Sequence, residues 1–66
     1  MDLSIIAPLY NEEDSVRPLY DAIVKSAHPL GLDYEILFVD DGSKDNTVAE
    51  ALKLAEKDKR LKIIIF

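Results

Sequence analysis

The chain has 66 residues, a length at which one hydrophobic core is only marginally able to stabilise a domain. Its net charge of −5 argues against a nucleic-acid partner, because an acidic chain gains nothing from counterion release on DNA or RNA. The absence of cysteine excludes a disulfide framework and a thiolate metal site, and one histidine alone cannot build a metal centre.

The first apolar run, residues 3–7, predicts a strand that ends before Pro8. The run hardly alternates with polar residues, so we expect this strand to be covered on both faces. It is too short for a secretory signal or a membrane span, which predicts a cytoplasmic location.

The next segment predicts an amphipathic helix. With Ser15 as its N-cap, Pro18 falls in the first turn, where a missing N–H costs no helical hydrogen bond. Pro29 and Gly31 are expected to end the helix and turn the chain. The apolar stripe has helical spacing and consists of Val16, Leu19, Tyr20, Ile23, Val24 and Ala27.

A second continuous apolar run, residues 34–39, predicts a second strand. A second helix should follow, capped by Ser43 or Asp45. Its expected apolar face is Val48, Ala51, Leu52 and Ala55, and its last turn is expected to carry Lys57, Lys59 and Arg60. Residues 61–66 predict a third strand.

Strands that alternate with helices predict an α/β fold with a parallel sheet. We expect the sheet order 3-2-1, two crossover helices, and cover on both faces of the sheet. An apolar last strand with a bare edge is an aggregation hazard. We therefore expect residues 1–66 to be the incomplete, N-terminal part of a larger domain, and we expect self-association through the third strand if that edge is exposed.

Two polar clusters follow the first two strands, at the edge of a parallel sheet where binding sites form. The first contains Pro8, Tyr10, Asn11 and Glu12, and the second begins with Asp40 and Asp41. An aromatic ring can stack on a nucleobase, and a carboxylate can accept hydrogen bonds from a ring N–H or a ribose hydroxyl. Neither cluster is a glycine-rich phosphate loop.

The segments 4–13 (SIIAPLYNEE) and 36–47 (ILFVDDGSKDNT) together resemble the opening of family 2 glycosyltransferases with the GT-A fold. Within that family the likeness is greatest to the polyprenyl-phosphate (dolichol- or undecaprenyl-phosphate) mannosyl- and glucosyltransferases. The resemblance covers essentially the whole chain.

This resemblance implies a nucleotide-sugar donor, UDP or GDP, bound by the two clusters. Pro8 and Tyr10, with Asn11 beside them, are expected to contact the base and ribose. Glu12 is expected near the ribose, and Asp41, with Asp40 beside it, is expected to hydrogen-bond the base.

The resemblance also implies an inverting hexosyltransferase that uses Mg or Mn and transfers to a polyprenyl phosphate or a cell-envelope glycan. That reaction would take place at the cytoplasmic face of a membrane. The family's metal-binding DxD motif and its catalytic base are not found in these residues, so we expect no catalytic and no metal-binding residue in this chain. The chain alone is expected to be inactive.

Three other classes of protein share part of this pattern. A receiver domain has a similar acidic pair, but that pair follows its first strand. A nucleotidyltransferase would carry a glycine-rich basic loop in place of the segment around Tyr10. A non-catalytic α/β fragment that self-associates through its exposed strand is the third.

Overall fold

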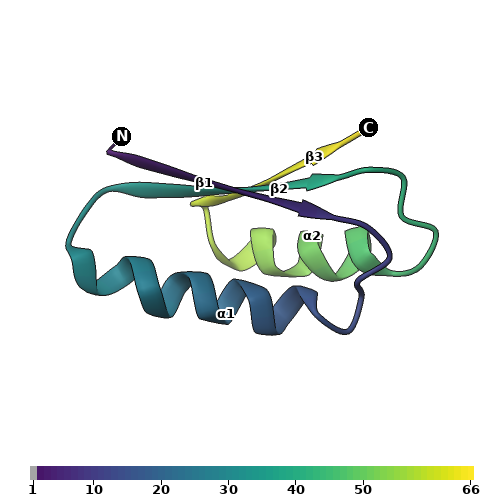
Figure 1. Cartoon of the computed structure of the whole chain (residues 1–66), viewed down its shortest axis with the longest axis horizontal. Coiled ribbons are helices and arrows are strands. Elements are labelled where there is room, and N and C mark those ends of the chain that lie inside the picture. Colours follow the sequence, from purple (N-terminus) through teal and green to yellow (C-terminus); the bar gives the residue numbers. More distant parts are fainter. Residues whose placement is uncertain (1) are drawn as a thin grey trace.

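The computed structural model describes residues 2–66. Figure 1 shows the elements, which are β1 (Leu3–Leu9), α1 (Val16–Ala27), a short 3-10 helix η1 (His28–Leu30), β2 (Tyr34–Asp40), α2 (Thr47–Lys57) and β3 (Leu61–Ile65). Each expected strand and helix is present. Strand β1 is longer than expected, because Pro8 and Leu9 continue it.

The strands form a three-stranded parallel sheet in the order β1-β2-β3. Leu3 lies opposite Tyr34 at one end of the first pair, and Leu9 lies opposite Asp40 at the other. Ile36 lies opposite Leu61 in the second pair. The predicted α/β class, parallel pairing and strand order are confirmed.

Both helices cover the same face of the sheet, below the strands in Figure 1. On that face Ile36 and Phe38 have no exposed surface. On the opposite face Ile6 is 65% exposed and Ile64 is 43% exposed. The expectation that both faces are covered is therefore wrong for residues 2–66. Two crossovers of the same hand that step in the same direction across a sheet place both helices on one side.

Helix α1 begins and ends as its sequence predicts. Ser15 is the N-cap residue, and its carbonyl accepts the N–H of Leu19 at 2.9 Å, so Pro18 lies within the first turn. Helix η1 follows directly, and Gly31 ends it with φ of 69°, in the left-handed region that glycine adopts without strain.

Helix α2 differs from its prediction in three details. Its N-cap residue is Asn46, whereas Asp45 accepts the backbone N–H of Thr47 with its side chain, at 2.9 Å. Its inner face carries the buried Thr47 and Ala51, and Leu52 is 50% exposed. The helix ends at Lys57, so Lys59 and Arg60 lie beyond its last turn.

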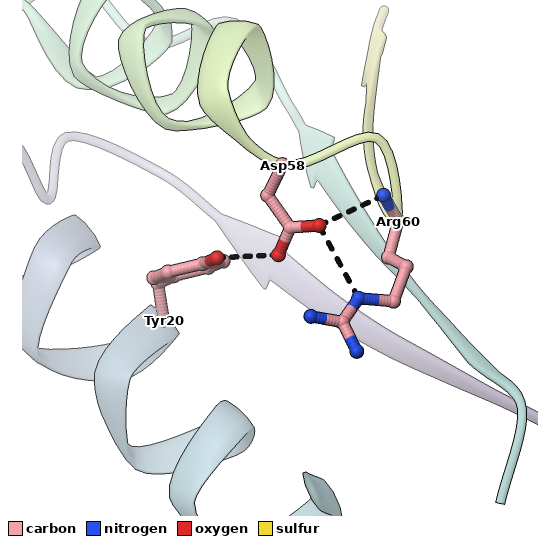
Figure 2. A network of polar contacts seen from close by, with 3 residues as sticks. All are labelled: Tyr20, Asp58 and Arg60. Carbon is pink, nitrogen blue, oxygen red and sulfur yellow. Dashed lines mark hydrogen bonds and ion pairs between the residues drawn. The ribbon is translucent and has the colours of Figure 1, made fainter.

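A polar network joins α1 to the turn between α2 and β3 (Figure 2). The hydroxyl of Tyr20 donates to one carboxylate oxygen of Asp58. The other oxygen accepts the backbone N–H of Arg60 at 3.0 Å and its Nε at 3.3 Å. The guanidinium of Arg60 also lies 4.6 Å from the ring centre of Tyr34, in cation–π contact. Burial raises the pKa of Asp58, but the hydrogen bonds from Tyr20 and Arg60 outweigh it, and the net pKa is lowered.

Replacing Tyr20 by phenylalanine tests this network. We expect the free energy of unfolding to fall by about 1 kcal/mol at neutral pH, because Asp58 loses one hydrogen bond. Burial, and then the bond to Asp58, raise the pKa of Tyr20 from 10.0 to about 12. A raised pKa contributes stability that is present below about pH 10 and is lost as the pH rises through about 12. Urea denaturation across this range should therefore show a steeper loss for the wild type than for Tyr20→Phe. The matched control is Tyr10→Phe, and equal slopes for wild type and Tyr20→Phe would contradict the expectation.

The open sheet face predicts that the isolated chain associates with itself. Ile6 and Ile64 are exposed on this face, and exposed apolar patches favour association. Sedimentation velocity over a range of concentrations should show oligomers for the wild type and fewer for Ile64→Lys. Leu52→Lys adds the same charge at an exposed apolar residue of α2 and should leave the association unchanged. Equal effects of the two substitutions would assign the association to net charge instead of this face.

Candidate functional site

Two loops meet at the carboxyl ends of β1 and β2, on the right in Figure 1. The first comprises residues 10–15 and leads into α1, and the second comprises residues 41–46 and leads into α2. The parallel pairing of β1 with β2 makes these loops neighbours, as the sequence predicts. The backbone N–H of Asp41 donates to the carbonyl of Leu9 at 3.1 Å, which places Asp41 beside the start of the first loop.

Hydrogen bonds between Asn11 and the second loop join the two loops. The N–H of Asn11 donates to the Ser43 hydroxyl at 2.9 Å, and the Asn11 side-chain oxygen accepts the N–H of Lys44 at 2.8 Å. Asn11 has φ of 50°, in the left-handed region, which asparagine tolerates better than most side chains. Asn11 therefore closes a reciprocal pair of hydrogen bonds between segments that are 32 residues apart in sequence.

The next two residues of the first loop extend this contact. The N–H of Glu12 donates to the Thr47 hydroxyl at 2.7 Å, and the N–H of Glu13 donates to the Asp45 carboxylate at 3.3 Å. Asp45 also accepts the Thr47 hydroxyl. This last hydrogen bond is the main reason that the pKa of Asp45 lies below its usual value. The carboxylate is therefore ionised, and remains an acceptor only, at neutral pH.

Asp40 is buried, with 1% of its surface exposed. Its carboxylate accepts the N–H of Ser43 at 3.0 Å and also accepts the Ser43 hydroxyl. Asp40 thus holds the second loop in place through its two hydrogen bonds from Ser43. The ligand contact expected of Asp40 stays a prediction. A buried carboxylate with these partners is stable, because the hydrogen bonds replace those it made to water.

The other residues expected at the site lie nearer the solvent. Tyr10 is 55% exposed, and Asp41 is exposed directly after the buried Asp40. Glu12 is half-buried, and its side chain reaches back toward the N–H of Tyr10 at 3.4 Å. Pro8 belongs to β1 and lies on the open face of the sheet, opposite Val39. Tyr10 and Asp41 therefore present an aromatic ring and a carboxylate to solvent.

The charge of the loops is strongly acidic. Residues 10–15 and 41–46 carry five Asp or Glu side chains besides the buried Asp40, namely Glu12, Glu13, Asp14, Asp41 and Asp45, and a single basic one, Lys44. Within residues 2–66, no three His, Cys, Asp or Glu side chains come together in a way that could hold a metal ion. The residues present do not fit the metal that the resemblance implies, and we derive no step through it.

An apolar hollow of about 380 Å³ lies elsewhere, between the first half of β1 and the end of α1. Its lining includes Leu3, Ile5, Ile23 and Leu30. It contains no charged side chain and faces away from the two loops, so we do not assign it to nucleotide binding.

The sequence does not indicate that Ser43 and Thr47 join the loops. It predicts at most a helix cap at Ser43. The only available signal was their spacing from the carboxylates Asp40 and Asp45, which is also the ordinary spacing of local turns. Their partners in the first loop lie more than 30 residues away.

Two adjacent carboxylates allow a matched test of this arrangement. Asp40→Ala should lower the free energy of unfolding by about 2–3 kcal/mol, because it removes a buried side chain and leaves two half-buried donors of Ser43 without their acceptor. Asp41→Ala should change it by less than about 0.5 kcal/mol, since its side chain is exposed. Urea denaturation of both variants measures the difference. Similar losses from the two substitutions would contradict the structural role of Asp40.

Comparison with known proteins places the chain in a family. Residues 4–66 match Glycosyl transferase family 2, and this match includes both loops. An uncharacterized glycosyltransferase of Synechocystis sp., sll0501, is 38% identical over 64 residues, which cover 97% of this chain and 20% of that protein.

Two further relatives carry more specific names. The undecaprenyl-phosphate 4-deoxy-4-formamido-L-arabinose transferase of Proteus mirabilis is 44% identical over 45 residues, 68% of this chain and 14% of that protein. The transferase of the same name from Enterobacter sp. is 40% identical over 55 residues, 83% of this chain and 17% of that protein.

The chain thus spans a fifth or less of the length of these relatives. Within residues 2–66, neither helix has the length and apolar character that crossing a membrane requires. The match over residues 4–66 and the identity to these transferases lead to one conclusion: the chain belongs to glycosyltransferase family 2.

Proposed function

We propose that residues 1–66 form the nucleotide-binding part of a glycosyltransferase whose donor is a UDP- or GDP-activated sugar. The observation that carries the proposal is that the family match over residues 4–66 includes both loops, in which Tyr10 and Asp41 are exposed and the Asp41 N–H donates to Leu9, the neighbour of Tyr10. The role of the chain is to bind and orient the donor. No bond is made or broken by these residues.

The recognition chemistry is base stacking and hydrogen bonding. The Tyr10 ring offers a face on which a nucleobase can stack, an interaction worth about 1–3 kcal/mol per base. Asp41 offers a charged acceptor for a ring N–H, which uracil and guanine both carry. The Glu12 carboxylate lies close to Tyr10 and is the group that we expect to accept from the ribose hydroxyls. Pro8 contributes an apolar surface at the end of β1.

The acidic character of the loops favours the neutral base over the diphosphate. Carboxylates at close range repel phosphate oxygens, and Lys44 is the one basic side chain in the two loops. We therefore propose that the diphosphate is bound, through Mg or Mn, by other parts of the whole protein. The length of the relatives supports this division.

For the acceptor we propose a polyprenyl phosphate, used at the cytoplasmic face of a membrane. Two relatives are named as undecaprenyl-phosphate transferases, which supports this acceptor. A cell-envelope glycan is the alternative acceptor. Transfer of a hexose stays a prediction, because those two relatives are named for an arabinose derivative.

Calorimetric titration of the chain with UDP and with GDP, each with and without Mn²⁺, tests the proposal. We expect saturable binding that favours one of the two nucleotides and does not depend on the metal. Tyr10→Ala should weaken binding by about 1–2 kcal/mol. Asp41→Ala should weaken it by a similar amount, about 1.5 kcal/mol or more, through loss of a charge-assisted hydrogen bond.

Two control variants separate base recognition from general effects. Tyr10→Phe keeps the aromatic face and should bind like the wild type. Asp14→Ala removes one exposed negative charge from the same end of the sheet and should not weaken binding. A folded chain that binds neither nucleotide, or equal effects of Asp41→Ala and Asp14→Ala, would contradict the proposed base contact.

A further inference from the structure

Ser43 and Thr47 occupy equivalent positions in the two-loop contact. Each hydroxyl donates a hydrogen bond to a nearby carboxylate, Asp40 at the end of β2 for Ser43 and Asp45 in the second loop for Thr47 at the start of α2. Each hydroxyl oxygen also accepts a backbone N–H from the first loop, at 2.9 Å from Asn11 and at 2.7 Å from Glu12. We call these two arrangements the hydroxyl relays.

The chemistry of the groups determines which one donates and which one accepts in each hydrogen bond of a relay. An ionised carboxylate can only accept and a backbone N–H can only donate, so a group between them must do both. A hydroxyl has one proton to donate and lone pairs that accept, which meets both requirements at once. Removing the hydroxyl leaves the first-loop N–H unpaired at each relay. It also takes away the one donor of Asp40 Oδ1 at Ser43, whereas Asp45 Oδ1 keeps the backbone N–H of Thr47.

The relays hold the backbone on both sides of the proposed base contacts. Tyr10 lies between Leu9, which is 1% exposed, and Asn11, whose N–H binds Ser43. Asp41 is the first residue of the second loop, directly after the buried Asp40, and its own N–H donates to the carbonyl of Leu9. The positions of both side chains therefore depend on bonds that other residues make.

Resting on the nucleotide site proposed above, we propose that Ser43 and Thr47 are positioning residues, whose hydroxyls hold Tyr10 and Asp41 in the arrangement that binds the nucleobase. They act through the backbone of the first loop and do not touch the ligand. A loop that is already ordered binds without the cost of ordering it.

The test compares removal of each hydroxyl with its retention. Ser43→Ala and Thr47→Val remove the hydroxyls, and Ser43→Thr and Thr47→Ser retain them. Amide hydrogen exchange of Asn11 and Glu12, followed by NMR, reports the relays, and exchange of Ile36 and Phe38 in the sheet reports the fold. Calorimetry with UDP and GDP gives Kd for each variant.

We expect exchange at Asn11 to quicken in Ser43→Ala, and exchange at Glu12 to quicken in Thr47→Val, by about tenfold, while Ile36 and Phe38 stay protected. Kd should rise roughly three- to tenfold in both variants, as expected when the binding-competent loop is populated for about a tenth to a third of the time. Ser43→Thr and Thr47→Ser should leave the amide exchange rates and Kd close to those of the wild type. Because Thr47 is buried, Ser43→Ala decides the matter if Thr47→Val fails to fold.

Three results would overturn the inference in distinguishable ways. Faster exchange with an unchanged Kd would make the relays purely structural and leave the proposed function standing. Unchanged exchange would show that the hydroxyls do not hold the first loop. Absence of nucleotide binding by the wild type would remove the proposed function itself, and with it any positioning role.

Discussion

The connection of parallel strands through crossovers of one hand is the constraint on which this structure depends. Strands β1, β2 and β3 step in one direction across the sheet, so α1 and α2 must lie on the same side of it. The same parallel arrangement brings the ends of β1 and β2 to one edge. A buried layer, an open sheet face and a pair of adjoining loops all follow from this one pattern.

The adjoining loops are joined by polar groups, and these satisfy backbone N–H groups that are partly shielded from water. Three successive N–H groups of the first loop donate to side chains of Ser43 and Asp45 in the second loop and of Thr47 at the start of α2. The carboxylates of Asp40 and Asp45 in turn fix the hydroxyls. The acidic residues of this region thus divide into those that maintain the loop and those, such as Asp41, that face solvent.

Much of the fold could be predicted because it depends on local patterns. The apolar stripe of α1, Ser15 before it and Gly31 after it act within a few residues, and the structure has each of them where expected. The predicted inner position of Leu52 on α2 is wrong, because Thr47 lies on the inner face instead. Thr47 can be buried there since its hydroxyl donates to Asp45. The apolar runs of the strands were read as evidence of cover on both sides, whereas Ile6 and Ile64 lie on an open face.

The sequence by itself determined the elements, their parallel order, the two loops and the resemblance to family 2 glycosyltransferases, because these are encoded in periodicity, turn residues and short motifs. Only the tertiary structure distinguished Asp40 from Asp41, one buried under Ser43 and the other exposed. Asp40 is the last residue of β2 and lies on the face that the helices cover, whereas Asp41 begins the loop beyond it. Alternate residues of a strand share a face, and which face is covered depends on the direction of the crossovers. The partners of Ser43 and Thr47 likewise come from a loop distant in sequence, so only the folded chain could identify them.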